Sequence, residues 1–174
     1  MMRTIFMGVL RLRSLALASV GLTLAAVSAS AQLPLPSFAV VGGVSHFDLS
    51  GTGTTAIGAL RAEIPLLSLV AEGSFGVMRP KEQDGTRTYI IPEAQLQYQI
   101  LPILVRPYIG VGGGLFKAVS GPDPHNSDFT ASAAVGVRAT LPLTGFGLRA
   151  EARVRGIGSG FGGSSTELTV GVSF

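Results

Sequence analysis

The sequence predicts an all-β protein, an eight-stranded antiparallel up-and-down barrel that follows a cleaved N-terminal signal peptide. Three observations lead to this prediction: strict apolar–polar alternation in the final ten residues, the same alternation in seven earlier segments, and an apolar leader. In the final segment Leu168, Val170, Val172 and Phe174 share one face, and the other face is polar or glycine. Because successive side chains on a strand point to opposite faces, this segment predicts a strand with one apolar and one polar face.

The leader, residues 1–31, is organised like a secretory signal peptide. Three arginines precede an uncharged apolar run at 15–27, and Ala29 and Ala31 fit a cleavage site of the A-x-A type. The run is shorter than the roughly 20 residues that a transmembrane helix needs. Because no two arginines are adjacent, we expect export by the general secretory route, cleavage after Ala31, and a barrel domain at 32–174.

Composition excludes several classes of function. The whole chain has 13 Lys and Arg and 10 Asp and Glu, but three of the arginines lie in the leader, so residues 32–174 carry ten charges of each sign. No basic cluster remains that would follow a phosphate backbone, and we expect no nucleic-acid partner. With 0 cysteines and 2 histidines, the sequence offers neither a disulfide nor a metal site, and we expect no cofactor.

Period-two alternation predicts eight strands, and no segment after the leader keeps a helical period. Each predicted strand is close to the roughly 9–11 residues that a tilted strand needs to cross the hydrocarbon layer of a membrane. Tight apolar turns that contain proline, such as Ile64–Leu67, alternate with polar or glycine-rich loops, such as 79–87 and 156–164. This alternation predicts short turns on one rim and longer loops on the other. The predicted strands are 37–47, 54–64, 68–78, 88–100, 106–117, 129–140, 146–156 and 165–174.

The face that points inward decides whether such a barrel is soluble or spans a membrane. A soluble, lipocalin-like carrier would place the apolar face inside. Here the apolar face is rich in Ala and Gly, which are too small to fill a ligand-binding interior, and aromatic residues near the strand ends match two interfacial girdles. These features favour the membrane orientation. The predicted girdles are Phe38, Tyr98, Tyr108, Phe146 and Phe174 on one rim, and Phe47, Tyr89, Phe116 and Phe129 on the other.

In a membrane barrel the charged face must point into the lumen. The segment 146–156 carries three arginines on one face, and a lipid-facing arginine near the midplane costs about 2–4 kcal/mol. Across the predicted hairpins, Arg61 should face Glu72 and Arg153 should face Glu167. The balance of sign fits a narrow interior, where an unpaired buried charge is costly. The predicted lumen charge network is Arg61, Glu63, Glu72, Glu93, Arg138, Arg149, Glu151, Arg153, Arg155 and Glu167.

Three segments resemble a known family, the small outer-membrane β-barrels that include the OmpA transmembrane domain and OmpX-like proteins. They are 106–114, 146–153 and 168–174, and their order and spacing carry the resemblance. It implies an eight-stranded transmembrane barrel with a polar, plugged core in the cell outer membrane. It also implies insertion by the barrel assembly machinery through the last strand. We further expect contact with outer-membrane lipid and lipopolysaccharide, and a monomer. The implied assembly signal is Leu168, Val170, Val172 and Phe174.

Two short motifs could carry chemistry. Gly158–Gly163 fits G-x-G-x-x-G, but that fingerprint binds phosphate only where a strand leads into a helix, and here it joins two predicted strands. His125 and Ser127 form a His-x-Ser pair, as in barrels of the lipid A deacylase type. Pro122 and Pro124 place the pair in a loop, so a hydrated loop is favoured and we expect no catalytic residue.

The sequence therefore predicts a non-enzymatic outer-membrane barrel with a structural or surface-interaction role. Three alternatives stay open: a narrow pore through the lumen, a lipid A-modifying barrel enzyme, and a periplasmic lipocalin-like carrier. The loop at 79–87 has charges of both signs and is expected to be solvated.

Overall fold

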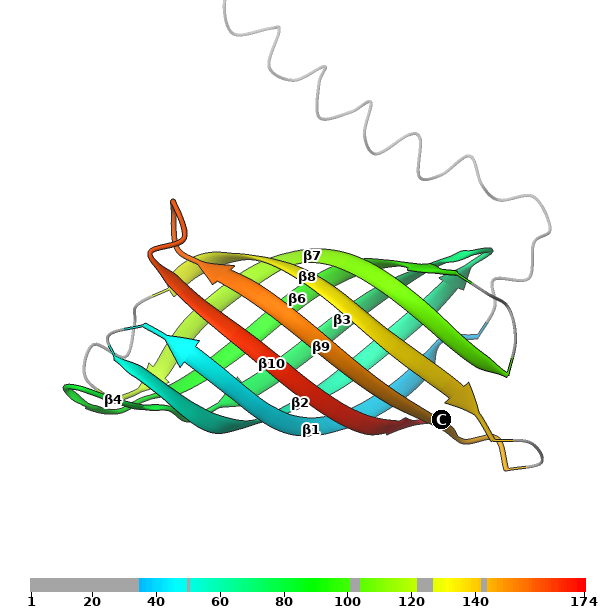
Figure 1. Ribbon diagram of the computed structural model, residues 1–174, viewed down its shortest axis with the longest axis horizontal. Helices are drawn as coiled ribbons and strands as arrows, with labels where there is room; N and C mark the ends of the chain where they lie inside the picture. The colour runs from blue at the N-terminus through cyan, green and yellow to red at the C-terminus, as the bar shows by residue number, and fades with distance from the viewer. Residues whose placement is uncertain (1–34, 50, 101–103, 122–126, 142–143) are drawn as a thin grey trace, which may run out of the picture. The chain divides into compact units, whose positions relative to one another are not determined.

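The computed structural model describes residues 35–49, 51–100, 104–121, 127–141 and 144–174. Eight of the ten strands in this part of the chain close into one antiparallel barrel, and β4 and β5 form a separate two-stranded hairpin (Figure 1). Among the described residues no helix has the length and apolar composition to cross a membrane. The strands are β1 (Ser37–Asp48), β2 (Thr52–Leu66), β3 (Leu69–Met78), β4 (Lys81–Glu82), β5 (Gly85–Thr86), β6 (Thr88–Gln99), β7 (Val105–Ser120), β8 (Ser127–Thr140), β9 (Gly147–Ile157) and β10 (Gly163–Ser173).

The predicted fold class is confirmed, and each predicted strand corresponds to one barrel strand. The strand order around the barrel is β1-β10-β9-β8-β7-β6-β3-β2, so neighbours in sequence pair and the first strand pairs with the last. The largest difference lies in β7, which continues to Ser120, three residues beyond the predicted end. Buried Ala118 continues the alternation and pairs with Tyr89 of β6, and after a shift of register Ser120 pairs with Thr88, so the ladder extends past the predicted boundary.

The turn between β2 and β3 is as tight as predicted. Leu66 pairs with Leu69, and Leu67 takes a positive φ of 61°. The other two predicted proline turns include residues 101–103 and 142–143, which lie outside the described residues. We call the rim that carries the β2–β3 turn the turn end, and the opposite rim, with the β4–β5 hairpin, the loop end.

The seam of the barrel, where β1 pairs with β10, runs from Ala39 at the turn end to Asp48 at the loop end. Ala39 of β1 pairs with Ser173 of β10, and ten consecutive pairs connect the two strands. Beyond the ladder, the backbone N–H groups of Phe38 and Phe174 each donate to the other residue's carbonyl at 2.9 Å. The seam therefore leaves no free edge between these strands.

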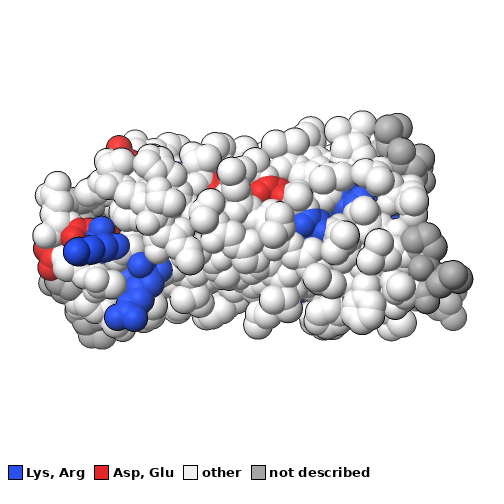
Figure 2. Space-filling view, turned by 60° about the horizontal axis from the view of Figure 1, so that its bottom comes forward, with Lys and Arg blue, Asp and Glu red and all other residues white. Residues whose placement is uncertain are grey.

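Alternation separates an apolar outer wall from a polar interior. On β10, Leu168, Val170 and Val172 are 58%, 65% and 42% exposed, and Phe174 directly after it is 56% exposed, whereas Glu167 is 3% exposed. Figure 2 shows that charged atoms gather at one end of the visible face, and that the wall beyond them is mostly uncharged with small charged patches. The wall therefore presents apolar side chains to its surroundings.

The predicted aromatic girdles are wrong for four residues. Phe38, Tyr98, Phe146, Phe174 and Phe129 are about half exposed or more on the wall, but Tyr108, Phe47, Tyr89 and Phe116 are buried in the interior. The reason is strand parity: Tyr108 is in phase with buried Gly110, and Phe116 is in phase with buried Ala118. Height along a strand does not determine which face a side chain occupies.

The interior has two layers of opposite chemistry. Toward the loop end lies an apolar layer, with Leu49 packed against it; below it, toward the turn end, lies a charged layer formed by the lumen charge network. The apolar layer consists of Phe47, Ile57, Met78, Tyr89, Ile91, Phe116, Ala118 and Ile157.

Candidate functional site

The charged layer is built from six strands of the barrel. All ten predicted network residues have the inward parity of their strand; nine are buried and Arg138 is partly buried. They are supplied by β2, β3, β6, β8, β9 and β10. The strand β9 alone supplies four, because Arg, Glu, Arg and Arg occupy its alternate positions from 149 to 155.

Glu72 on β3 lies at the centre of this layer. Its carboxylate is 3.1 Å from Arg61 and 2.9 Å from Arg149. It also lies 3.5 Å from Arg153 and accepts a hydrogen bond from Gln97 at 3.1 Å. One carboxylate therefore connects β2, β6 and β9 across the interior, and the expected Arg61–Glu72 contact is present.

A second set of contacts spans the barrel to Glu151 on β9. Arg61 donates to Glu151 at 3.1 Å, although the two residues are 90 positions apart. Arg153 and Arg149 lie 2.9 and 3.3 Å from the same carboxylate. Strands that are not neighbours in the barrel are thus joined directly through paired charges.

The network continues toward the loop end through Glu93. This carboxylate is 3.0 Å from Arg153 and 2.6 Å from Arg155. Arg155 also forms an ion pair with Glu167. Arg153 and Glu167 are Cα partners in the β9–β10 ladder, as expected, but Glu167 pairs with the guanidinium one step further along β9. The register prediction holds, whereas the choice of ion-pair partner differs.

Toward the turn end, Glu63 pairs with Arg138, the one remaining cation of the layer, and also with Arg149. Arg138 lies 2.8 Å from its carboxylate, and Arg149 forms a second ion pair with it. Each of the five carboxylates therefore has at least one arginine partner. This pairing offsets the cost of removing the charges from water.

Tyr108 belongs to the charged layer and was missed by the sequence analysis. Its side chain is fully buried, its hydroxyl donates to Glu151 at 2.6 Å, and it accepts from Arg149 at 3.0 Å. The guanidinium of Arg138 lies over its ring at 4.9 Å, within the range of a cation–π contact. The signal that would have found it is its parity with the inward glycines of β7.

Small residues make room for these long side chains. A Cβ at Gly136 would collide with the ring of Tyr108, and a Cβ at Gly110 would lie 3.0 Å from Gln95 and Gln97. The void beside Arg61 and Arg153 has a volume of about 10 Å³. That is close to the space of one water molecule.

The predicted solvated loop at 79–87 contains a buried polar group instead. Tyr89 donates to Glu82 at 2.6 Å, Arg87 lies 3.5 Å from Glu82, and Arg87 also pairs with Asp84. Burial disfavours the charged guanidinium, but hydrogen bonds to Tyr89 and Asp84 and the charge of Glu82 outweigh it and raise the pKa of Arg87. The β4–β5 hairpin positions this group at the loop end.

The other predicted site residues lie apart from the network. The proposed assembly signal on β10 lies on the outer wall. Ala29, Ala31 and His125 lie outside the described residues, and Ser127 is the exposed first residue of β8. The glycine-rich segment from Gly158 joins β9 to β10, so it has the loop context expected for it.

Solved structures with the same fold include those of two bacterial proteins. Neisserial surface protein A (NspA) superposes with a TM-score of 0.68 at 16% identity, covering 79% of this chain and 95% of that chain. Ail, the attachment invasion locus protein of Yersinia pestis, superposes with a TM-score of 0.51 at 16% identity, covering 80% and 97%. No protein-family model and no curated protein matches the chain. At this identity the likeness establishes the shared fold alone.

Proposed function

We propose that this chain is an integral protein of the outer membrane, directed to export by residues 1–31, which are then removed, with a structural or surface-interaction role and no catalytic activity. Its barrel spans the membrane as a monomer, surrounded by lipid and lipopolysaccharide. The outward residues of β10, ending at Phe174, form the signal that the barrel assembly machinery recognises.

One observation carries this proposal: the wall is apolar and the interior is charged. On β9, Leu148 and Val154 are 48% and 55% exposed, while Arg149 and Arg153 between them are 4% and 3% exposed. In water such a wall would be an aggregation hazard, whereas in lipid it is the stable orientation. A lipocalin-like carrier would need the opposite arrangement, with the charged face outside.

The lumen is closed to ions in this proposal. An eight-stranded barrel is just wide enough for side chains to fill it. Here Arg61 reaches Glu151 across the interior, and the apolar layer lies between this network and the loop end. An ion would have to displace paired charges and then pass a layer without polar partners.

The role at the cell surface is supported by the two structural neighbours. One is described as a surface protein and the other as an attachment invasion locus protein. Neither description names chemistry that would need an active site. The loop end of this barrel, with its hairpin and glycine-rich loop, is the part that would meet partners outside the cell.

Cell fractionation, followed by electrophoresis of the outer-membrane fraction with and without boiling, tests the proposal. We expect a band that requires detergent for extraction and changes mobility on boiling, because a folded barrel resists the detergent used in the gel. A protein that extracts in buffer, without a mobility change, contradicts the membrane assignment.

A conductance measurement distinguishes a barrel with a closed lumen from a narrow pore. In planar bilayers the purified protein should give no steady single-channel current. A steady current that is lost in Arg149→Leu or Arg153→Leu would overturn the closed lumen while leaving the membrane location intact.

A further inference from the structure

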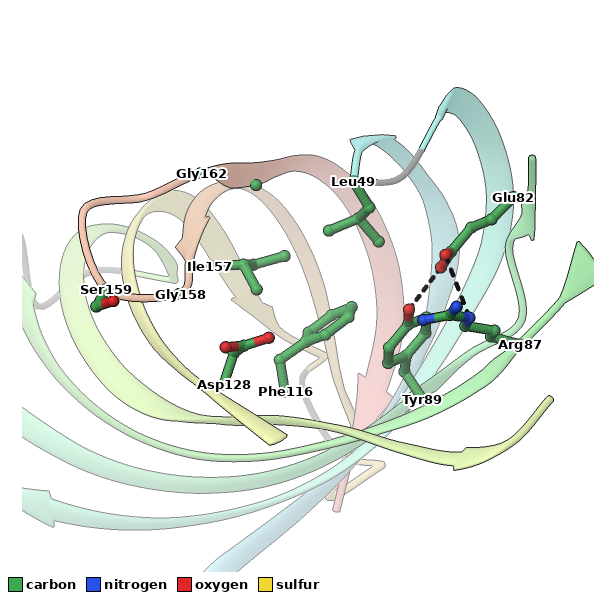
Figure 3. A pocket seen from close by; sticks show the side chains of 11 residues that line it. Leu49, Glu82, Arg87, Tyr89, Phe116, Asp128, Ile157, Gly158, Ser159 and Gly162 are labelled. Carbon is green, nitrogen blue, oxygen red and sulfur yellow. Dashed lines mark hydrogen bonds and ion pairs between the residues drawn. The ribbon is translucent and has the colours of Figure 1, made fainter. Parts of the chain in front are cut away.

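The loop end of the barrel holds a cup, a cavity of about 360 Å³ that opens above the apolar layer (Figure 3). Its walls come from β6, β7, β8 and β9 together with the segments around Leu49, Glu82 and Gly162. The volume lies in the range of cavities that bind small organic molecules. The closed lumen proposed above makes no use of this space.

The floor of the cup is apolar. Phe116 and Ile157 belong to the buried apolar layer, and Leu49 packs against it. The rings of Tyr89 and Phe116 lie 4.3 Å apart at an angle of 36°. A molecule in the cup would therefore contact aliphatic and aromatic side chains below and would not reach the arginines of the charged layer.

One side of the cup is polar but already internally paired. Tyr89 donates to Glu82, and Arg87 lies between Glu82 and Asp84. The single guanidinium of this side thus faces two carboxylates. Because its charge is already compensated, this side would not attract an anion.

The opposite side carries Asp128 of β8. It has the inward parity of its strand, is partly buried, and points into the cup in Figure 3. Within the described part of the chain it makes no ion pair or hydrogen bond. The cup is thus lined by two carboxylates, those of Glu82 and Asp128, against the one guanidinium of Arg87, so the charge of its lining is negative.

We propose that the cup binds a small organic cation, a protonated amine carried on an apolar body. The ammonium group donates to Asp128, and the apolar body rests on Phe116, Ile157 and Leu49. A charge-assisted hydrogen bond in a partly dry site is stronger than a neutral one, and the aromatic rings add attraction for a cation. The occupant is thus selected by its charge and by its apolar surface together.

Calorimetric titration of the folded barrel in an uncharged maltoside detergent tests this. The probe is 2-phenylethylamine, and the comparison molecule is 2-phenylethanol, which has the same shape without the charge. We expect saturable binding of the amine at least about tenfold tighter than of the alcohol, the difference that one charge-assisted hydrogen bond supplies.

Three variants locate the binding. Asp128→Asn should remove the preference for the amine. Asp48→Asn, the matched control, removes a carboxylate that hydrogen-bonds Thr52 on the same rim and does not line the cup, so it should keep the preference. Gly162→Phe should weaken the binding of both the amine and the alcohol. A Cβ at Gly162 meets no atom within 4 Å, so the larger side chain has room to occupy the mouth of the cup.

The mobility change on boiling shows that each variant is folded before it is titrated. Equal binding of the amine and the alcohol to the wild-type protein would overturn the proposal. So would an Asp128→Asn variant that keeps the preference, or a wild-type titration without saturation.

Discussion

The charged layer and the apolar layer fill the same narrow tube with side chains that are equally buried. Glu72 in the first is 2% exposed and Ile91 in the second is 1% exposed. Glu72 depends on partners from several strands, since Arg61, Arg149 and Arg153 all lie within 3.5 Å of it. The contribution of Ile91 to stability depends only on the volume that its side chain fills. We therefore expect changes in the charged layer to spread across the barrel and changes in the apolar layer to stay local.

The largest effect is expected for Glu72→Leu. The substitution leaves three arginines without their shared carboxylate, and breaking a buried ion pair from one side costs about 3–5 kcal/mol. The free energy of unfolding, measured by urea titration of the protein in lipid vesicles, should fall by that amount.

A second substitution shows whether the loss comes from charge imbalance. Arg149→Met added to Glu72→Leu should recover about 0.5–3 kcal/mol, the range of coupling between residues in one ion-pair network. Asp48→Asn, at the exposed rim, should stay within about 0.5 kcal/mol of wild type. If the changes in the free energy of unfolding for the two network substitutions simply add, Glu72 and Arg149 do not interact.

An intermediate effect is expected for Gly136→Ala. The new methyl group would occupy the place of the Tyr108 ring and push its hydroxyl away from Glu151. Overpacking of this kind costs about 1–3 kcal/mol. The matched control is Gly73→Ala on β3, where a Cβ meets no atom within 4 Å. In the same urea titration, equal stability of the two variants would show that Tyr108 is not held in place by its surroundings.

The smallest effect is expected for Ile91→Val in the apolar layer. Loss of one buried methylene group costs about 0.5–1.5 kcal/mol. Because Ile91 shares no ion pair with the charged layer, combining this change with Arg149→Met should be additive within about 0.3–0.5 kcal/mol. A larger coupling, seen in the same unfolding experiment, would mean that the two layers are not independent.

Much of the charged layer could be predicted from the sequence, because strand parity acts on every residue alike. The alternation around Arg149 and Arg153 placed both side chains inside before any partner was known. The same rule, applied to Tyr108 and Phe116, would have placed them inside as well. Their position near the strand ends is typical of an interfacial girdle, but their parity places them inside.

The contacts across the lumen could not be predicted in this way. Arg61 and Glu151 meet because closure of the barrel brings β2 within reach of β9, beyond β1 and β10, and no local pattern contains that information. The buried group of Glu82 and Arg87 was missed for a related reason. Short hairpins in loops have no periodicity to read, and their side-chain contacts depend on how the loop folds back on the rim.

The seam between β1 and β10 sets a condition on how the protein folds. Phe38 and Phe174 are joined by two backbone hydrogen bonds, yet they stand at opposite ends of the barrel sequence. Contacts between such distant residues form late, because the whole intervening chain must be ordered first. Until the seam forms, two strands keep unpaired backbone groups that can pair with another chain. Productive folding therefore depends on how quickly the seam closes and on whether chaperones cover the two open edges until then. The final stability of the barrel does not determine either of these.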